Sequence, residues 1–423
     1  MKQSRRDFLK LVTGIAGGAI VLSSMPWLNT FVKGSRAGKA ASDKVRLGII
    51  GVGDRGSLLL QTFKQFEKTG NFEIAAVCDN YQPNYENALK LTDGKAAGFY
   101  DYQKLLDMKD IDAVVIATPL NEHAHIAIDA MNAGKHVFCE KSIARTIEDV
   151  NRMMETHKKT GMILQIGHQR LFSPIYIEAI DKIKNGKIGK VTQMRAYWHR
   201  NGNWRRPVPK DKPELERKIN WRLYKEYSAG LLTELASHQI QVANWIKGEP
   251  PVSVIGSGNI IYWKDGREVW DNVALVYKYS DGTHLIYDSV ISNRHYGLEE
   301  QILGDKGTIE MEVNKIYWED HPSAPAIQRL VTDIEKDVFG SVPIGGASWT
   351  PEVGIKDKGE FITGNYQMDE VQLELEGFVN YVRDGKAPEE LTIQGYHATI
   401  WSLLGEQAIN ENKLITFENK IEL

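Results

Sequence analysis

The chain has few cysteines and no excess of basic residues. Only two cysteines occur among 423 residues, Cys78 and Cys139, and each ends a predicted buried strand. Their spacing fits neither a disulfide framework nor a zinc site, so we interpret both as packing thiols. Basic residues number 52 against 55 acidic ones, which gives no indication of nucleic-acid binding. Repeats and low-complexity tracts are absent, and the length suffices for two domains.

The first 41 residues have the pattern of a twin-arginine (Tat) signal peptide. Arg5 and Arg6 precede Asp-Phe-Leu-Lys, and an apolar run rich in glycine and alanine covers residues 11–28. Small residues at 38 and 40 suit a signal peptidase. The alternative is a membrane anchor, because residues 11–28 approach the minimum spanning length. The glycine content favours cleavage, so we expect a periplasmic or otherwise exported protein that uses the Tat export machinery.

A glycine-rich turn follows the first apolar run, residues 45–50. Gly51, Gly53 and Gly56 have the spacing G-x-G-x-x-G, and an amphipathic run, residues 57–66, comes next. In such a turn the first glycine permits a tight bend and the second lets the backbone approach a pyrophosphate. The third lets the helix pack close to the strand. A helix N-terminus after the turn also favours an anion. The pattern predicts a dinucleotide site.

Asp79 specifies the dinucleotide further. It follows a second strand-like run, residues 72–78, at the distance where a carboxylate accepts hydrogen bonds from an adenosine ribose. The same carboxylate would repel a 2′-phosphate. The sequence therefore favours NAD over NADP.

Strand and helix patterns alternate over residues 44–168, which predicts a Rossmann fold, a doubly wound parallel sheet. The further strands are expected at residues 111–119, 136–139 and 162–166, and helices at 85–91, 102–106, 123–133 and 147–159. Residues 169–423 read as an α+β domain with a mainly antiparallel open sheet. Its strands are expected at 191–198, 252–258, 273–279, 284–289 and 301–303, and its helices at 174–185, 369–383 and 395–412. The two final helices could pack back on the first domain.

Several motifs, in order, resemble those of the Gfo/Idh/MocA oxidoreductases, which include glucose–fructose oxidoreductase and inositol dehydrogenase. The resemblance covers most of the chain after residue 44. Its motifs are the glycine turn, T-P-x-x-x-H, A-x-x-x-G-K-H-V-x-x-E-K, G-x-I-G-x-V and a variant of G-x-L-x-D-x-G-x-H. They stand here at residues 51–56, 118–123, 130–141, 186–191 and 230–238.

The resemblance implies roles for particular residues. Lys141 would be the catalytic lysine and His238 its partner, with Glu234 divided between a catalytic and a structural role. A partly desolvated lysine near a cation has a depressed pKa and can take the proton of a secondary hydroxyl. His123 would stabilise the loop beside the nicotinamide or cap a helix. The cofactor-binding residues implied are Gly51, Gly53, Asp54, Arg55, Gly56, Asp79, Thr118, Pro119, His123, Glu140 and Lys141.

The chain departs from the family pattern at two positions. The family's E-K-P becomes Glu140-Lys141-Ser142, which removes the backbone restriction of the proline. The family's D-x-G-x-H becomes Glu234-Leu-Ala-Ser-His238, whose carboxylate is one methylene longer. The second departure puts the role of Glu234 in doubt and indicates altered substrate geometry.

Polar and aromatic residues gather where the family reads its substrate. Amide, guanidinium and imidazole groups beside tryptophan faces suit a carbohydrate, because sugar C–H faces stack on indole and hydroxyls take hydrogen bonds. For any single tryptophan, a place in the core or in an interface is equally open. No ligand spacing supports a metal site. The substrate-binding candidates are His168, Gln169, Arg170, Trp198, His199, Trp204 and Trp221.

These observations leave three functions open. The first is an exported NAD-dependent oxidoreductase acting on a secondary hydroxyl of a sugar or glycoside. Free NAD is expected to be scarce outside the inner membrane, so the cofactor would stay bound and be recycled internally. The second is an NAD-dependent glycoside hydrolase or lyase that oxidises the 3-hydroxyl transiently, as in the branch near the NAD-dependent α-N-acetylgalactosaminidases. The third is a non-catalytic sugar-binding or scaffold protein. The resemblance also implies a homo-dimer or tetramer.

Overall fold

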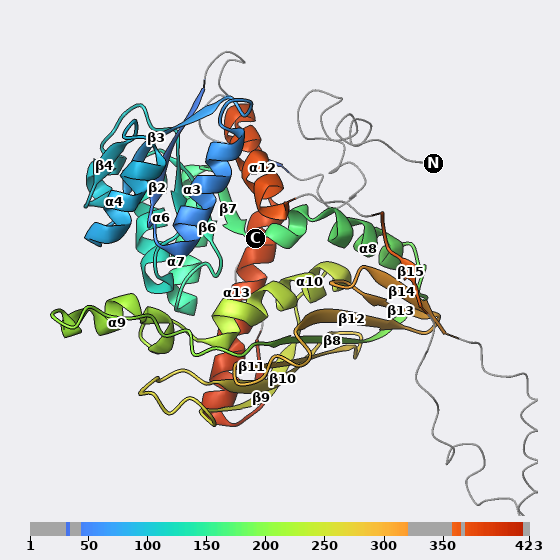
Figure 1. Ribbon diagram of the computed structural model, residues 1–423. Coiled ribbons are helices and arrows are strands. Elements are labelled where there is room, and N and C mark those ends of the chain that lie inside the picture. Colours follow the sequence, from blue (N-terminus) through green and yellow to red (C-terminus); the bar gives the residue numbers. More distant parts are fainter. Residues whose placement is uncertain (1–30, 34–43, 320–357, 365–368, 418–423) are drawn as a thin grey trace, which may run out of the picture.

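The computed structural model describes residues 31–33, 44–319, 358–364 and 369–417. The described chain forms two layered units joined by two long helices (Figure 1). The predicted signal segment, residues 1–41, lies outside the described residues except for β1 (Phe31–Lys33), which pairs antiparallel with β16 (Lys386–Pro388). No described helix has the length and apolar character needed to cross a membrane.

The first unit is the predicted Rossmann fold. Its six strands are all parallel and lie in the order β4-β3-β2-β5-β6-β7, with the chain reversing direction across the sheet between β2 and β5. Ligands of such sheets bind at the carboxyl ends of the strands beside this switch point. The strands are β2 (Val45–Ile50), β3 (Phe72–Cys78), β4 (Ala97–Phe99), β5 (Ala113–Ile116), β6 (His136–Glu140) and β7 (Leu164–Gly167). The helices are α3 (Asp54–Phe66), α4 (Gln82–Leu91), α5 (Tyr102–Leu106), η2 (Leu120–Glu122), α6 (His123–Asn132), α7 (Ile147–Thr160) and η3 (Gln169–Phe172).

The second unit is a nine-stranded sheet in the order β15-β14-β13-β12-β8-β11-β10-β9-β17. All its neighbours are antiparallel except β8 and β11, so the prediction of a mainly antiparallel sheet is confirmed. The strands are β8 (Val191–His199), β9 (Ser253–Asn259), β10 (Asn272–Lys278), β11 (His284–Val290), β12 (Leu298–Gly304), β13 (Gly307–Glu310), β14 (Lys315–Trp318), β15 (Glu360–Phe361) and β17 (Ile415–Thr416).

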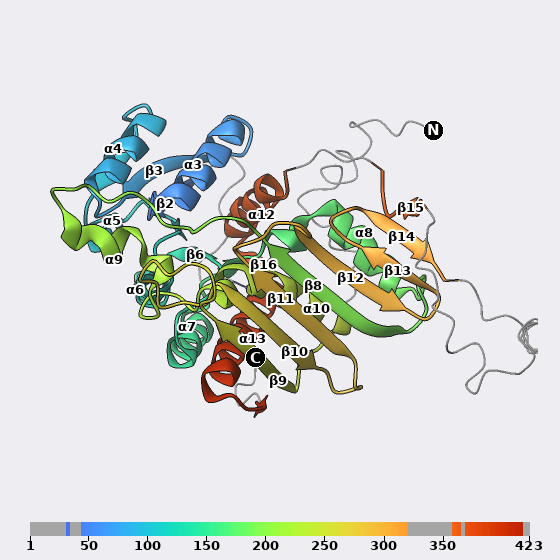
Figure 2. The ribbon, with the colours of Figure 1, turned by 60° about the horizontal axis from the view of Figure 1, so that its bottom comes forward.

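Helices cover one face of this sheet, and Figure 2 looks onto the other face, where the broad strands lie in front of the helices. The covering helices are α8 (Pro174–Lys184), α10 (Ser237–Lys247) and α13 (Glu390–Glu411), whereas α12 (Glu370–Asp384) packs on α3 and β2 of the first unit. Sequence analysis predicts no helix at the position of α10. Its residues Ser237 to Ile246 are buried on every side, so it lacks the polar stripe that marks a surface helix.

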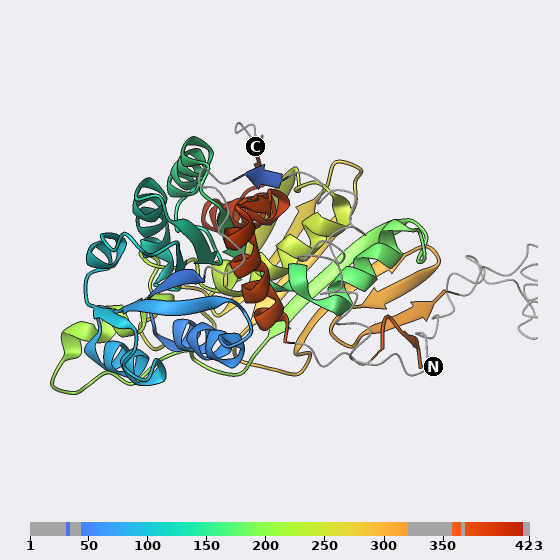
Figure 3. The same cartoon turned by 90° about the horizontal axis from the view of Figure 1, so that it is seen from above.

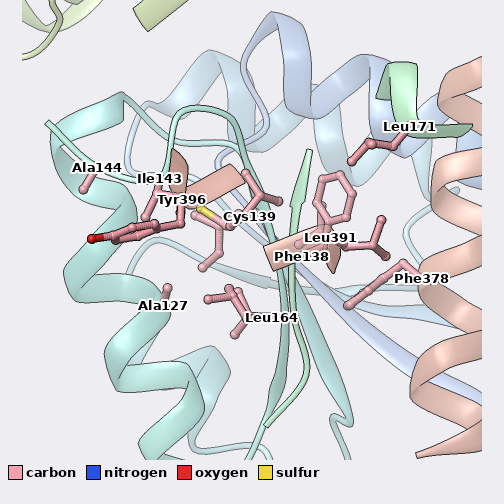
Figure 4. Packing of buried hydrophobic residues seen from close by; sticks show 14 of the residues in the cluster. Ala127, Phe138, Cys139, Ile143, Ala144, Leu164, Leu171, Phe378, Leu391 and Tyr396 are labelled. Carbon is pink, nitrogen blue, oxygen red and sulfur yellow. The ribbon is translucent and has the colours of Figure 1, made fainter. Parts of the chain in front are cut away.

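The two final helices join the units, as the view from above shows (Figure 3). α13 packs on β7 and α7 of the first unit as well as on β9 and α10 of the second. In Figure 4, Phe378 of α12 and Tyr396 of α13 lie beside the strand residues Phe138 and Leu164. The rings of Phe138 and Phe378 meet edge to face at 5.6 Å. Residues of both units belong to one hydrophobic cluster, so the units share one core. Fully burying one such side chain contributes about 1.5–3 kcal/mol.

A segment of the second unit reaches back across the first. We call residues 200–228 the strap; it carries the short helices η4 (Pro213–Leu215), α9 (Glu216–Ile219) and η5 (Trp221–Leu223). Figure 2 shows α9 beside α4 and α5 of the Rossmann unit. Buried Asn220 holds the strap together: its side chain accepts from the backbone of Arg206 at 2.7 Å and donates to the Arg206 carbonyl at 3.1 Å.

Candidate active site

The glycine turn has the geometry that a dinucleotide site requires. Gly51 adopts φ +84°, and a Cβ there would lie 2.7 Å from the backbone of Ala117 and Thr118. A Cβ on Gly56 would collide with the Gly51 carbonyl oxygen. Gly53 differs, because the nearest atom to a Cβ built there is Asn84 Nδ2 at 3.6 Å. Gly51 and Gly56 are therefore fixed by protein packing, whereas the space beside Gly53 is open to a ligand.

The residues around the turn also fit NAD. Gly53 precedes α3 without any side-chain cap, which leaves backbone N–H groups directed at an anion. The Asp79 carboxylate accepts from Val52 N at 2.8 Å and from Tyr81 N at 2.8 Å, so it stands directly beside the turn. The buried Thr118 hydroxyl, across the switch point, has no hydrogen-bond partner among the described residues. NAD would be held by the turn, Asp79 and Thr118.

His123 ties two strand-end loops together. Its Nδ1 lies 2.8 Å from the carbonyl oxygen of Ser142, and its Nε2 lies 2.9 Å from that of Thr118. Burial lowers its pKa, and the two carbonyls offset this in part. His123 is the first residue of α6, behind Pro119, which precedes η2. These contacts join the loop after β5 to the loop after β6.

Two of the predicted cofactor residues bind each other. Arg55 Nε donates to Glu140 Oε1 at 2.5 Å, and the other oxygen of Glu140 accepts from Lys141 N at 3.2 Å. Asp54 forms an ion pair with Arg206 of the strap. The pair of Arg55 and Glu140 therefore fixes the start of the loop that carries Lys141.

Lys141 is largely surrounded by protein at the end of β6. Its Nζ donates to the main-chain oxygens of Thr233 at 3.2 Å and Glu234 at 3.0 Å. Burial lowers its pKa; Glu234 and Glu140 oppose this, while Arg222 and Arg55 add to it. The peptide bond from Lys141 to Ser142 is cis. The pKa of Lys141 is thus shifted downward, which is the direction that the sequence analysis predicts.

The oxygens that hold Lys141 come from a single π-helical turn, η6 (Leu232–Ala236), which runs into α10. Such turns recur at functional sites. The Glu234 carboxylate itself accepts from Arg222 Nε at 2.9 Å and from Ser228 Oγ at 3.3 Å. Burial would raise the pKa of Glu234, but Lys141 and Arg222 outweigh it, so the pKa is lowered and the side chain is an anion.

Two buried histidines complete the group. The rings of His168 and His238 meet edge to face at 5.7 Å, and Trp198 lies 5.9 Å from His238. Burial, followed by the charge of Lys141, lowers the pKa of His168 to about 3 and that of His238 well below its usual value. Both rings are therefore neutral near pH 7, and His238 Nδ1 has no hydrogen-bond partner within the described chain.

The remaining substrate candidates divide into two sets. Arg170 is buried and tied to Glu300 and Glu312, with its guanidinium 5.7 Å from the Trp198 ring. His199 points to the opposite face of β8 from Trp198, because successive strand residues alternate. There it lies 2.5 Å from Asp288 Oδ2. The structure thus brings Trp198 beside His238 but does not bring His199 there.

The other candidates lie on the loop after β7 and on the strap. Gln169 begins η3, next to His168. Trp204 is part of the strap and adopts φ 60°. Trp221 lies on η5 with the Arg222 guanidinium 4.2 Å from its ring.

Sequence reasoning missed Arg222 and Thr233. Arg222 carried no motif, and Thr233 contributes a main-chain oxygen, which no residue type signals. The described residues contain no group of three or more His, Cys, Asp or Glu side chains placed to hold a metal. Cys78 and Cys139 are buried and free, with thiol pKa values raised by burial, which agrees with packing roles.

Comparisons with known proteins agree with this geometry. Residues 45–168 match the family described as "Oxidoreductase family, NAD-binding Rossmann fold", and residues 176–310 match "GFO/IDH/MocA C-terminal domain". Myo-inositol 2-dehydrogenase of Thermotoga maritima is 27% identical over 270 residues, covering 63% of this chain and 74% of that protein. Alpha-N-acetylgalactosaminidase of Shewanella oneidensis is 25% identical over 455 residues, covering 96% and 93%.

Solved structures share the fold. The WlbA dehydrogenase of Bordetella pertussis, in complex with NADH and UDP-GlcNAcA, has a TM-score of 0.67 at 20% identity and covers 89% of this chain and 100% of its own. The two family matches together span most of both units. The chain therefore belongs to the Gfo/Idh/MocA family of NAD-binding oxidoreductases.

Proposed function

We propose that the protein oxidises a secondary hydroxyl of a sugar or glycoside, with Lys141 as the base. The observation that carries the proposal is the Lys141 amine, which is held by main-chain oxygens and depressed in pKa beside neutral His238. Bound NAD would accept the hydride from the carbon that bears the hydroxyl. Lys141 would take the hydroxyl proton, and His238 would orient the oxygen through a hydrogen bond.

A sugar suits the mixture of aromatic and guanidinium groups beside these residues. Trp198 lies next to His238 with the Arg170 and Arg200 guanidinium groups each 5.7 Å from its ring, and the indole of Trp221 lies beside Arg222. Related proteins are named for polyhydroxylated rings and glycosides, an inositol dehydrogenase and an N-acetylgalactosaminidase among them. A carbohydrate is therefore the substrate class we propose.

We further propose that NAD stays bound between turnovers. The strap contacts both sides of the glycine turn: Arg206 pairs with Asp54, and Lys218 Nζ donates to the carbonyl of Asn80 at 3.1 Å, directly after Asp79. A segment fastened at both places would slow release of a dinucleotide lying on the turn. Mass spectrometry of small molecules released by denaturing the purified protein should find NAD. If folded, purified protein releases no NAD on denaturation, the proposal that NAD stays bound between turnovers is refuted.

The second candidate is a glycoside hydrolase without net redox change. The N-acetylgalactosaminidase aligns with 96% of the chain, whereas the inositol dehydrogenase aligns with 63%. In this reaction the 3-hydroxyl is oxidised to a ketone, which acidifies the neighbouring C2–H. A base of the protein removes that proton, the aglycone leaves, water adds and the ketone is reduced back. Release of nitrophenol from a nitrophenyl glycoside without added NAD would favour this candidate; formation of an oxidised sugar with a second substrate would favour the first.

Export and assembly are separate proposals. We propose that residues 1–41 direct Tat export, because paired Arg5 and Arg6 precede an apolar run. Replacing both by lysine should keep a fused reporter in the cytoplasm.

We also propose that two copies pair through the outer face of the nine-stranded sheet, where Ile255, Val276 and Ile286 form a row across three strands. Ile286→Arg should then yield monomers in light scattering; an unchanged mass would refute this face.

A further inference from the structure

Each carboxylate beside Lys141 is paired with an arginine. Glu140 binds Arg55 at 2.5 Å, and Glu234 binds Arg222 at 2.9 Å. Lys141 Nζ instead donates to the two main-chain oxygens of η6. Within the described chain no ion pair joins Lys141 to a carboxylate. The lysine therefore lies between two ion pairs and binds main-chain oxygens instead of either carboxylate.

The carboxylate of Glu234 binds the strap at two points. Arg222 comes from η5, which is anchored where Glu268 N donates to the Leu223 carbonyl at 2.8 Å. Ser228 Oγ holds the other oxygen of Glu234 at 3.3 Å. Both oxygens of Glu234 are thus turned toward the strap.

We propose that Arg222 is a positioning residue for the reaction: by binding Glu234 it keeps that carboxylate from forming an ion pair with Lys141, so that the amine is free to accept the substrate's proton. The inference rests on the proposed role of Lys141 as base. Arg222 acts through Glu234 and by its own charge, and it needs no contact with substrate. The strap thereby connects two regions: its own contacts beside the glycine turn and the lysine that takes the proton.

The charges that face Lys141 decide the sign of the effect. Glu234 and Glu140 raise the pKa of Lys141, while Arg222 and Arg55 lower it. Burial lowers the pKa of His168 and of His238, the charge of Lys141 lowers both further, and the two rings are therefore neutral. Removing the charge of Arg222 frees the Glu234 carboxylate to pair with Lys141, so the lysine would hold its proton to higher pH. Removing the charge of Glu234 should have the opposite effect.

The test is the pH dependence of kcat in the holoenzyme. Oxidation needs neutral Lys141, so kcat rises with pH through the lysine's titration. In Arg222→Gln this midpoint should move to higher pH, and in Glu234→Gln to lower pH. Arg222→Lys keeps the charge, so its midpoint should return most of the way to that of the wild type. Arg217→Gln is the matched control, because Arg217 lies on the same strap but pairs with Glu226 and Glu268.

A second measurement does not depend on turnover. Acetylation by acetic anhydride, quantified at Lys141 by peptide mass spectrometry, reports the neutral amine, and its pH dependence should shift as kcat does. A lower kcat plateau with an unmoved midpoint in Arg222→Gln would reduce Arg222 to a structural role and overturn the inference. Turnover that survives in Lys141→Ala would instead refute the proposed function, so the two failures are distinguishable.

Discussion

The glycine turn and the lysine site lie at the same edge of the parallel sheet, but they are assembled over different distances along the chain. The turn is built from neighbours: Gly51, Gly53 and Gly56 bend the backbone, and Asp79 joins them from the next strand. The lysine site gathers residues from β6, η6 and the strap. A contiguous motif specifies cofactor binding, whereas the chemistry depends on how the second unit and its strap pack on the first.

The largest effect is expected on the lysine side. Lys141→Ala removes the general base and should lower kcat by about 10²–10⁴-fold, since proton transfer contributes about that much. NAD affinity should stay unchanged because the glycine turn is untouched. Steady-state kinetics and a fluorescence titration with NADH measure the two quantities, with exposed Lys104→Ala as the control. Unchanged turnover would remove Lys141 from the mechanism.

The turn itself can be divided into its protein and ligand sides. Gly56→Ala would place a Cβ on the Gly51 carbonyl, so it should destabilise the fold by about 1–3 kcal/mol and abolish NAD binding. Gly53→Ala meets no close protein atom and should alter stability by less than about 0.5 kcal/mol while still weakening NAD binding. Urea unfolding and NADH titration separate the two. Equal losses of stability would contradict the open space beside Gly53.

The strap connects the two regions, and its buried anchor should matter more than its exposed ends. Asn220→Ala leaves the backbone groups of Arg206 without their partners, a cost of about 1–3 kcal/mol, and should speed NAD release. Lys218→Ala should have a smaller effect, because exposed charged contacts contribute about 0–1 kcal/mol. Stopped-flow dissociation of NADH gives both rates. Identical rates for the wild type and Asn220→Ala would show that the strap does not retain the cofactor.

A last effect, on stability rather than on turnover, concerns Glu374 of α12, behind the pair of Arg55 and Glu140. Burial, reinforced by the charge of Glu140, raises its pKa well above the usual value. The folded state therefore holds a proton that the unfolded state loses above about pH 4.5, so this contribution to stability falls as pH rises by up to about 1.4 kcal/mol per unit. Glu374→Gln should gain stability relative to the wild type as pH increases from 5 to 8. A pH-independent difference in urea unfolding would contradict the shift.

Sequence reasoning reached the first unit more fully than the second. The predicted run at 72–78 is β3 itself, and the helix predicted at 147–159 is α7 (Ile147–Thr160). Buried parallel strands are continuous apolar runs that end in recognisable turns. α10 was missed because its polar residues are buried together with its apolar ones, so polarity does not mark an exposed face of the helix. The parallel pairing of β8 with β11 also had no local signal, because strand order is decided by packing.

The amino-acid sequence by itself determined the glycine turn, the carboxylate at the end of the second strand and the family motifs, because each depends on residues a few positions apart. Only the tertiary structure decided what holds Lys141. Its anchors are main-chain oxygens of Thr233 and Glu234, which any residue type would supply, and the carboxylate of Glu234 turns to Arg222. Local rules of sterics and hydrogen bonding fix the first set. The second depends on burial and on charges brought together from about 90 residues away.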